Sequence, residues 1–146
     1  MKVRGRAGER GSSLVEFAIV TTCALTLLFG VIDFGRALYT YHLVTDAARY
    51  GTRYAIVHGS ACTAPSCPAT AAQIQTYVRG LAPGIDPNAM TVTTTWASGT
   101  GCSGGSFQGP GCLATVQVRY TFAFVAPLMP SFSLPMTSTS QMVISQ

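Results

Sequence analysis

The longest apolar run in the chain covers residues 14–32, and Glu16 is the only charged residue inside it. At 1.5 Å per residue, a helix over this run would span about 28 Å. The hydrocarbon core of a bilayer is about 30 Å thick, so the lengths match. The pattern therefore predicts a transmembrane helix, which we place at residues 12–33.

Apolar positions continue at helical spacing beyond the run, while polar and charged residues favour the other sides. We expect one unbroken helix from about Ser13 to about Val57, with residues 34–57 amphipathic and packed on a folded domain. The residues expected on the packed face are Phe34, Ala37, Leu38, Tyr41, Val44, Ala48, Gly51 and Ala55. Those expected on the other sides are Arg36, Thr40, Asp46, Arg49 and Arg53.

A Gly, Ser, Pro and Cys-rich connector over residues 58–70 cannot continue the helix. The next segment, residues 71–82, predicts a short second helix that is ended by the glycine and prolines of "APGIDPN". Its expected packing face consists of Ile74, Tyr77, Val78 and Leu81.

Residues 89–146 carry three segments that alternate or are rich in β-branched and aromatic residues: "AMTVTTTWAS", "CLATVQVRYTFAF" and "PMTSTSQMVIS". They predict a three-stranded antiparallel sheet, with Trp96 and Tyr120 as core or rim aromatics. The predicted fold class is therefore α+β, with the long helix laid across the sheet and one short extra helix. In the middle segment the core face is expected to be Ala114, Val116, Val118, Tyr120, Phe122 and Phe124.

The most apolar stretch outside the long helix is "FVAPLMPSFSLPM", residues 124–136. We expect a loop that wraps the sheet edge. The alternative is a surface for a partner or for the membrane, formed by Leu128, Met129 and Phe132.

Charge is concentrated at the N-terminus. Four cations and Glu9 give the first eleven residues +3 of the net +4, which predicts a cytoplasmic N-terminus by the positive-inside rule. The rest of the chain has no basic face, so nucleic acid is not an expected partner. Neither His42 nor His58 has a partner at metal-ligand spacing, and no paired carboxylates, nucleophile elbow or phosphate loop occurs, so we expect no enzyme, metal or cofactor.

Four cysteines follow the long helix, in loops rich in small residues: Cys62, Cys67, Cys102 and Cys112. Their spacings do not fit a zinc knuckle, and we favour disulfides over metal ligation. Of the three possible connectivities we prefer the local pairs Cys62–Cys67 and Cys102–Cys112. Disulfides would place this domain in an oxidising compartment. Cys23, in the apolar run, is predicted to be an inert apolar residue.

Small residues recur every fourth position in the apolar run, at Ala18, Thr22, Thr26 and Gly30. Such a stripe lets helices approach closely in lipid. The alternative is that a run with this composition shows the stripe by chance.

Glu16 needs an explanation because placing a charged carboxylate in the lipid costs free energy. A cut between Gly11 and Ser12 would create an α-amino group four residues away, one turn along the same helix face. A secretory signal peptide is a competing reading of the N-terminus, but the run is long, contains Glu16 and lacks a clear cleavage site. The remaining alternative for Glu16 is an interfacial acid that reaches water without a function.

The basic leader 1–11, Gly11, Glu16 and Phe17 together resemble the class III signal of type IV pilin-like proteins. "GSSLVEFAIV", "LLFGVIDFGRALY" and "DAARYGTRYA" resemble the TadE-like minor pilins of tight-adherence (Flp) pilus systems. One departure is Thr22, where family members often carry a proline that bends the helix.

The resemblance implies a type IV pilin-like fold and a structural role in assembling or priming a pilus. It also implies cleavage after Gly11 by a prepilin peptidase, and a protein of the bacterial inner membrane whose domain, residues 34–146, lies in the periplasm. Other pilins, pseudopilins and the pilus assembly platform are the implied partners. The rival hypothesis is a membrane-anchored module that binds a periplasmic ligand and uses the helix only as a tether.

Overall fold

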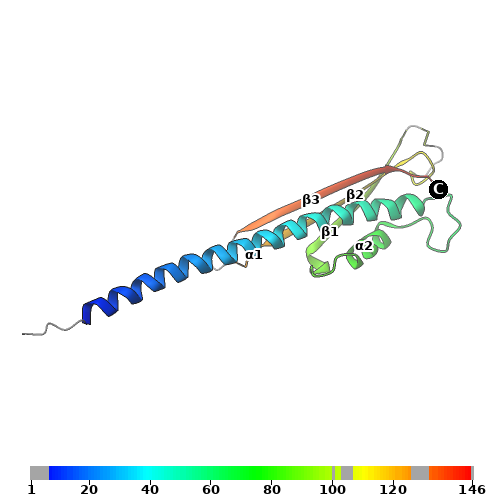
Figure 1. Ribbon diagram of the computed structural model, residues 1–146. Helices are drawn as coiled ribbons and strands as arrows, with labels where there is room; N and C mark the ends of the chain where they lie inside the picture. The colour runs from blue at the N-terminus through cyan, green and yellow to red at the C-terminus, as the bar shows by residue number, and fades with distance from the viewer. Residues whose placement is uncertain (1–6, 100, 103–106, 126–131, 146) are drawn as a thin grey trace, which may run out of the picture.

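The computed structural model describes residues 7–99, 101–102, 107–125 and 132–145. Its elements are the helix α1 (Ala7–Val57), the helix α2 (Ala71–Gly80), a short 3-10 turn at Pro87–Ala89, and the strands β1 (Met90–Ala97), β2 (Leu113–Ala123) and β3 (Ser133–Val143). One half of α1 projects as a rod, and the other half lies along the sheet with α2 beside it (Figure 1). The predicted α+β fold is confirmed.

The three strands form one antiparallel sheet in the order β1-β2-β3. The central strand places Val116 opposite Thr94 on one side and Ser140 on the other. The helix α1 contacts β2 and β3, whereas α2 contacts α1 and β1. The two helices therefore cover neighbouring strips of the same sheet.

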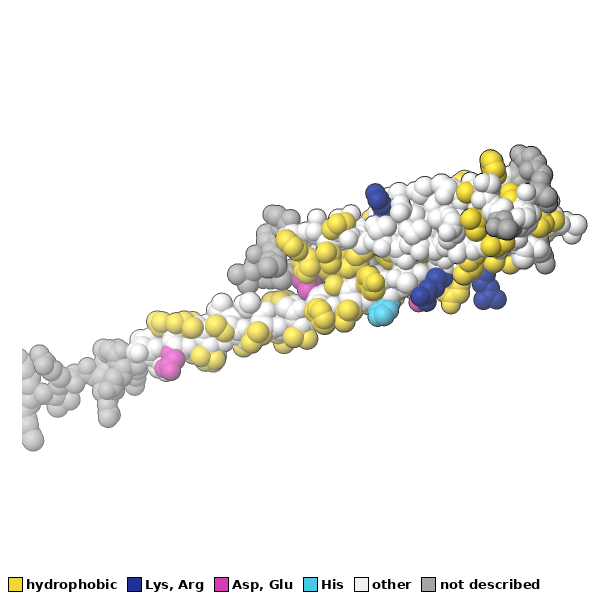
Figure 2. All heavy atoms as spheres, turned by 90° about the horizontal axis from the view of Figure 1, so that it is seen from above, with side chains coloured by type: hydrophobic (Ala, Val, Ile, Leu, Met, Phe, Trp, Pro, Cys, Tyr) yellow, Lys and Arg dark blue, Asp and Glu magenta, His cyan; other side chains and the backbone are white. Residues whose placement is uncertain are grey.

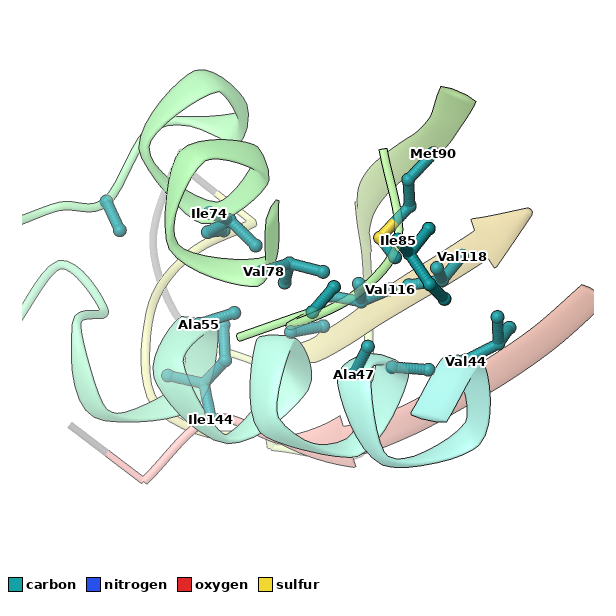
Figure 3. Packing of buried hydrophobic residues seen from close by; sticks show 14 of the residues in the cluster. Val44, Ala47, Ala55, Ile74, Val78, Ile85, Met90, Val116, Val118 and Ile144 are labelled. Carbon is teal, nitrogen blue, oxygen red and sulfur yellow. The ribbon is translucent and has the colours of Figure 1, made fainter. Parts of the chain in front are cut away.

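The core lies between the sheet and the two helices. Along β2, Ala114, Val116, Val118 and Phe122 are buried, which confirms the predicted parity of the core face. Figure 3 shows Val116 and Val118 of β2 between Val78 of α2 and Val44 and Ala47 of α1, and Ile74 of α2 belongs to the same cluster. Burying each such side chain stabilises the fold by about 1.5–3 kcal/mol, while Trp96 and Tyr120 pack half-buried at the rim.

The short helix α2 begins with a capping box. The Thr70 hydroxyl accepts a hydrogen bond from the Gln73 backbone N–H, and the Gln73 side chain accepts one from the Thr70 backbone N–H. This pairing satisfies two donors that a helix start leaves without partners. The helix ends at Gly80, two residues earlier than predicted.

Only two of the four residues expected on the packed face of α2 are buried, namely Ile74 and Val78. Tyr77 is 38% exposed and Leu81 is 37% exposed. Tyr77 instead stacks on Tyr54 of α1, with ring centroids 4.5 Å apart. An amphipathic face predicted from spacing is wider than the strip that a ten-residue helix buries here.

Two disulfides join the cysteines in local pairs. Cys62–Cys67 has a Cα–Cα distance of 5.7 Å and closes a loop after α1. Cys102–Cys112 has a Cα–Cα distance of 4.4 Å, and Cys112 is fully buried in the core. Gly111 beside it has φ +83°, and a Cβ there would lie 2.9 Å from the backbone N of Cys102, so only glycine allows this close approach.

The long helix starts earlier than predicted, at Ala7 and not near Ser13. Before Val44, its packed face also consists of other residues than predicted. Val44, Ala48, Gly51 and Ala55 are buried as expected, but Phe34, Leu38 and Tyr41 are 64%, 45% and 54% exposed.

Two threonines on α1 are buried, in contrast to these exposed apolar residues. Thr40 was expected on the polar side, yet it is only 5% exposed, and its hydroxyl donates to the carbonyl of Arg36 at 2.9 Å. Thr52 is completely buried, and its hydroxyl lies 2.8 Å from the Ala48 carbonyl and 3.1 Å from the Ser140 carbonyl. A threonine can be buried at low cost because the helix carbonyl four residues back satisfies its hydroxyl.

The expectation of a loop over residues 124–136 is wrong at its end, since β3 begins at Ser133. Pro135 is tolerated within β3 because this is an edge strand, where a missing N–H breaks no ladder on the open side. Leu128 and Met129, which were considered as a partner surface, lie outside the described residues.

Candidate functional site on the long helix

The projecting half of α1 exposes nearly all of its apolar side chains. Leu14, Phe17, Leu27 and Val31 are each 71–72% exposed. The helix contains an eighteen-residue window with a mean hydropathy of 2.2, none of which is buried within the chain. By length and composition α1 is able to cross a membrane, and Figure 2 shows its hydrophobic side chains running along the rod.

The residues predicted for processing lie at the start of this rod. Gly11, Ser12, Glu16 and Phe17 are all exposed on α1. Ser12 and Glu16 are four residues apart in one helix, so they occupy neighbouring positions on the same face. Within the described part of the chain Glu16 makes no ion pair.

The peptide bond between Gly11 and Ser12 lies inside the helix, because α1 starts at Ala7. A protease acting on that bond therefore has to unwind about one and a half turns of the helix. Terminal turns fray readily, so this requirement is a modest one.

The small-residue stripe is exposed along its whole length, from Ala18 through Thr22 and Thr26 to Gly30. The Thr22 hydroxyl donates to the Ala18 carbonyl at 2.8 Å, and the Thr26 hydroxyl donates to the Thr22 carbonyl at 2.8 Å. The hydroxyls are thereby satisfied within the helix, as a lipid environment requires. A Cβ placed on Gly30 would meet nothing within 4 Å, so the surface here is open to a neighbour.

The end of the apolar run carries a polar junction that sequence reasoning missed. Asp33 is only 3% exposed. Its carboxylate accepts a hydrogen bond from Arg36 at 2.8 Å and another from the backbone N–H of Val125 at 3.0 Å. The Arg36 guanidinium also lies 5.3 Å from the ring centroid of Phe122, a cation–π distance.

Asp33 and Arg36 thus form an ion pair within the chain. The signal that could have revealed this is an acid directly after an apolar run with an arginine three residues further on. Asp46 and Arg49 form a second pair at 3.9 Å, but both side chains are well exposed. Such a surface pair contributes little to stability.

The histidines have structural surroundings. His58 stacks on Tyr54 with centroids 4.0 Å apart, and its Nδ1 lies 3.0 Å from the Tyr54 carbonyl oxygen. His42 is exposed on α1. Among the described residues no group of three His, Cys, Asp or Glu side chains is placed to hold a metal ion.

The fold and the site define a class of protein in which one exposed apolar helix continues without a break into the core of a small α+β domain. Residues 11–53 match the family model described as TadE-like protein, which confirms the resemblance to that family. The match begins at Gly11, covers most of α1 and includes none of the sheet. No curated protein and no solved structure gives a significant match.

The match indicates a pilin-like protein associated with Tad pili and carrying an N-terminal membrane-anchor helix. TadE-like proteins are structural components of pili and are not known as enzymes.

Proposed function

We propose that the chain is a minor pilin-like subunit that helps to assemble or prime a tight-adherence (Flp) type IV pilus. The observation that carries the proposal is the TadE-like match over residues 11–53. These residues lie in α1, whose apolar first half is not covered by any other part of the described chain. An uncovered apolar helix is stable only in lipid or against other apolar helices. A pilus subunit uses both environments in turn.

The precursor is held in the bacterial inner membrane, with its basic leader in the cytoplasm and its domain in the periplasm. The cations of the leader and the disulfides of the domain support this orientation. A prepilin peptidase removes residues 1–11. The new α-amino group of Ser12 then lies one helical turn from Glu16, which gives the carboxylate a counter-charge in its own subunit or in a neighbour.

The mechanism is mechanical and depends on packing between helices. The stripe of Ala18, Thr22, Thr26 and Gly30 presents small side chains with satisfied hydroxyls to the α1 helix of another pilin or pseudopilin. The prepilin peptidase and the assembly platform are the remaining partners.

Replacing Glu16 by Ala in the native host tests this function. Folded, membrane-inserted protein should remain at normal abundance, since Glu16 makes no contact with the domain, whereas pilus formation should fall severely. Asp46→Ala is the matched control, because it removes an exposed acid from the packed half of the same helix. Normal piliation of the Glu16→Ala strain would favour a simple tether.

A further inference from the structure

An apolar groove of about 680 Å³ lies where the projecting half of α1 meets the sheet. It begins at Gly30, inside the apolar run, and continues along the helix to Tyr41. The opposite wall comes from Phe124 and from the start of β3. Figure 2 shows hydrophobic side chains continuing from the rod onto the near end of the domain.

One hydrogen bond marks the position of this groove along α1. The backbone N–H of Val125, just past the end of β2, donates to the carboxylate of Asp33. Asp33 follows directly on the apolar run of residues 14–32. The near end of the sheet is therefore level with the point where the helix leaves the hydrocarbon.

This end of the domain exposes several large apolar side chains. Val125 is 66% exposed, Phe132 is 58% exposed and Leu134 is 41% exposed. On the facing turns of α1, Phe34 and Tyr41 are 64% and 54% exposed. Contiguous apolar surface marks a contact site, and aromatic residues gather where a membrane meets water.

We propose that the near end of the sheet rests in the interfacial layer of the membrane, and that the groove takes the acyl chain of a phospholipid. A lipid is the occupant because the groove opens at Gly30, within the run itself, and so is continuous with the lipid-facing surface of the helix. The Arg36 side chain, 46% exposed, lies at the height of the headgroup phosphates. This inference rests on the membrane anchoring in the proposed function.

Spin labels measure the depth of chosen residues in vesicles of phosphatidylethanolamine and phosphatidylglycerol. The full chain with Cys23→Ser is labelled at one new cysteine per sample: Val125→Cys, Phe132→Cys, Gln141→Cys or Val20→Cys. Labels at 125 and 132 should collide with oxygen more than with a water-soluble nickel complex. Gln141 is the matched control on β3, about 30 Å further along the strand, and its label should show the reverse.

Position 20, in the middle of the run, separates the two proposals. If its label is in lipid while 125 and 132 face water, the inference is overturned and the proposed anchoring stands. If the label at 20 also faces water, both fail. A second copy of the chain would cover this end if labels at 125 or 132 showed spin–spin coupling between chains that disappears on dilution with unlabelled protein. That result would also overturn the inference.

Occupancy of the groove is tested with brominated acyl chains, which quench a nearby tryptophan. In a Trp96→Phe background, Tyr41→Trp should be quenched several-fold more strongly than Tyr50→Trp, which lies nine residues further along α1 and is 51% exposed. Equal quenching at the two positions would overturn the assignment of an acyl chain to the groove.

Discussion

The backbone N–H of Val125 donates a hydrogen bond to the carboxylate of Asp33, at 3.0 Å and across 92 residues of chain. The bond connects the residue two positions past β2 to the residue that directly follows the apolar run. Together with the Arg36 contact it forms a polar junction between the helix and the near end of the sheet. Any change in this junction should therefore alter both stability and the orientation of the domain.

Replacing Asp33 by Asn removes the charge but keeps the shape. Hydrogen bonds to charged groups contribute about 1.5–3 kcal/mol, so we expect the free energy of unfolding in detergent micelles to fall by about 2 kcal/mol. The control is Asp46→Asn, whose side chain is 60% exposed and whose loss should cost less than about 0.5 kcal/mol. Equal stabilities of the two variants would contradict a structural role for the junction.

Gly51 lies at a close approach between α1 and the core. A Cβ there would lie 2.7 Å from Cγ2 of Val78 and 3.1 Å from Cγ1 of Val116, and valine side chains are stiff. Overpacking costs about 1–3 kcal/mol, partly offset by the better helix propensity of Ala. Gly51→Ala should therefore lower the free energy of unfolding by up to about 2 kcal/mol in a denaturant titration.

Gly35 is the matched control for Gly51, since a Cβ placed on it meets nothing within 4 Å. Gly35→Ala should raise the free energy of unfolding by about 0.5–1 kcal/mol, the usual gain in an exposed helix. The two glycines thus predict changes of opposite sign. A loss at Gly35, or a gain at Gly51, would mean that α1 packs differently on the sheet.

The stripe on α1 makes a prediction about partners. Thr26→Leu places a bulky side chain where helices are proposed to meet, so less of each partner pilin should co-purify after mild detergent extraction. Thr21→Leu makes the same change off the stripe and should leave co-purification unaltered. Equal recovery of partners with both variants would remove the stripe from the account.

The sequence predicted the fold because its patterns are long and consistent. The alternation from Ala114 to Phe122 defines one buried face of β2, and the apolar run defines the projecting rod. It failed where burial depends on distant contacts. Asp33 and Thr52 are buried because Val125 and Ser140 supply partners from strands that are far away in the chain.

The exposure of three large side chains on α1 was not predicted, for a related reason. Helical spacing placed Phe34, Leu38 and Tyr41 on the packed face, but in this part of α1 the buried residues are Asp33 and Thr40. The apolar spacing therefore indicated the wrong side of the helix before Val44, because polar side chains with hydrogen-bond partners are buried there. For the candidate site, spacing predicted which residues share a face of α1 and that Ser12 lies one turn from Glu16. Cleavage after Gly11 by a prepilin peptidase came from the resemblance, and the roles of Gly11 and Glu16 remain predictions.

The central claim is that the leader is removed and that the amine of Ser12 then lies opposite Glu16. Intact mass and N-terminal sequencing of the protein extracted from membranes of its native host test it most directly. The account predicts a mature chain that starts at Ser12. A chain that still starts at Met1, in cells whose prepilin peptidase is active, would contradict it.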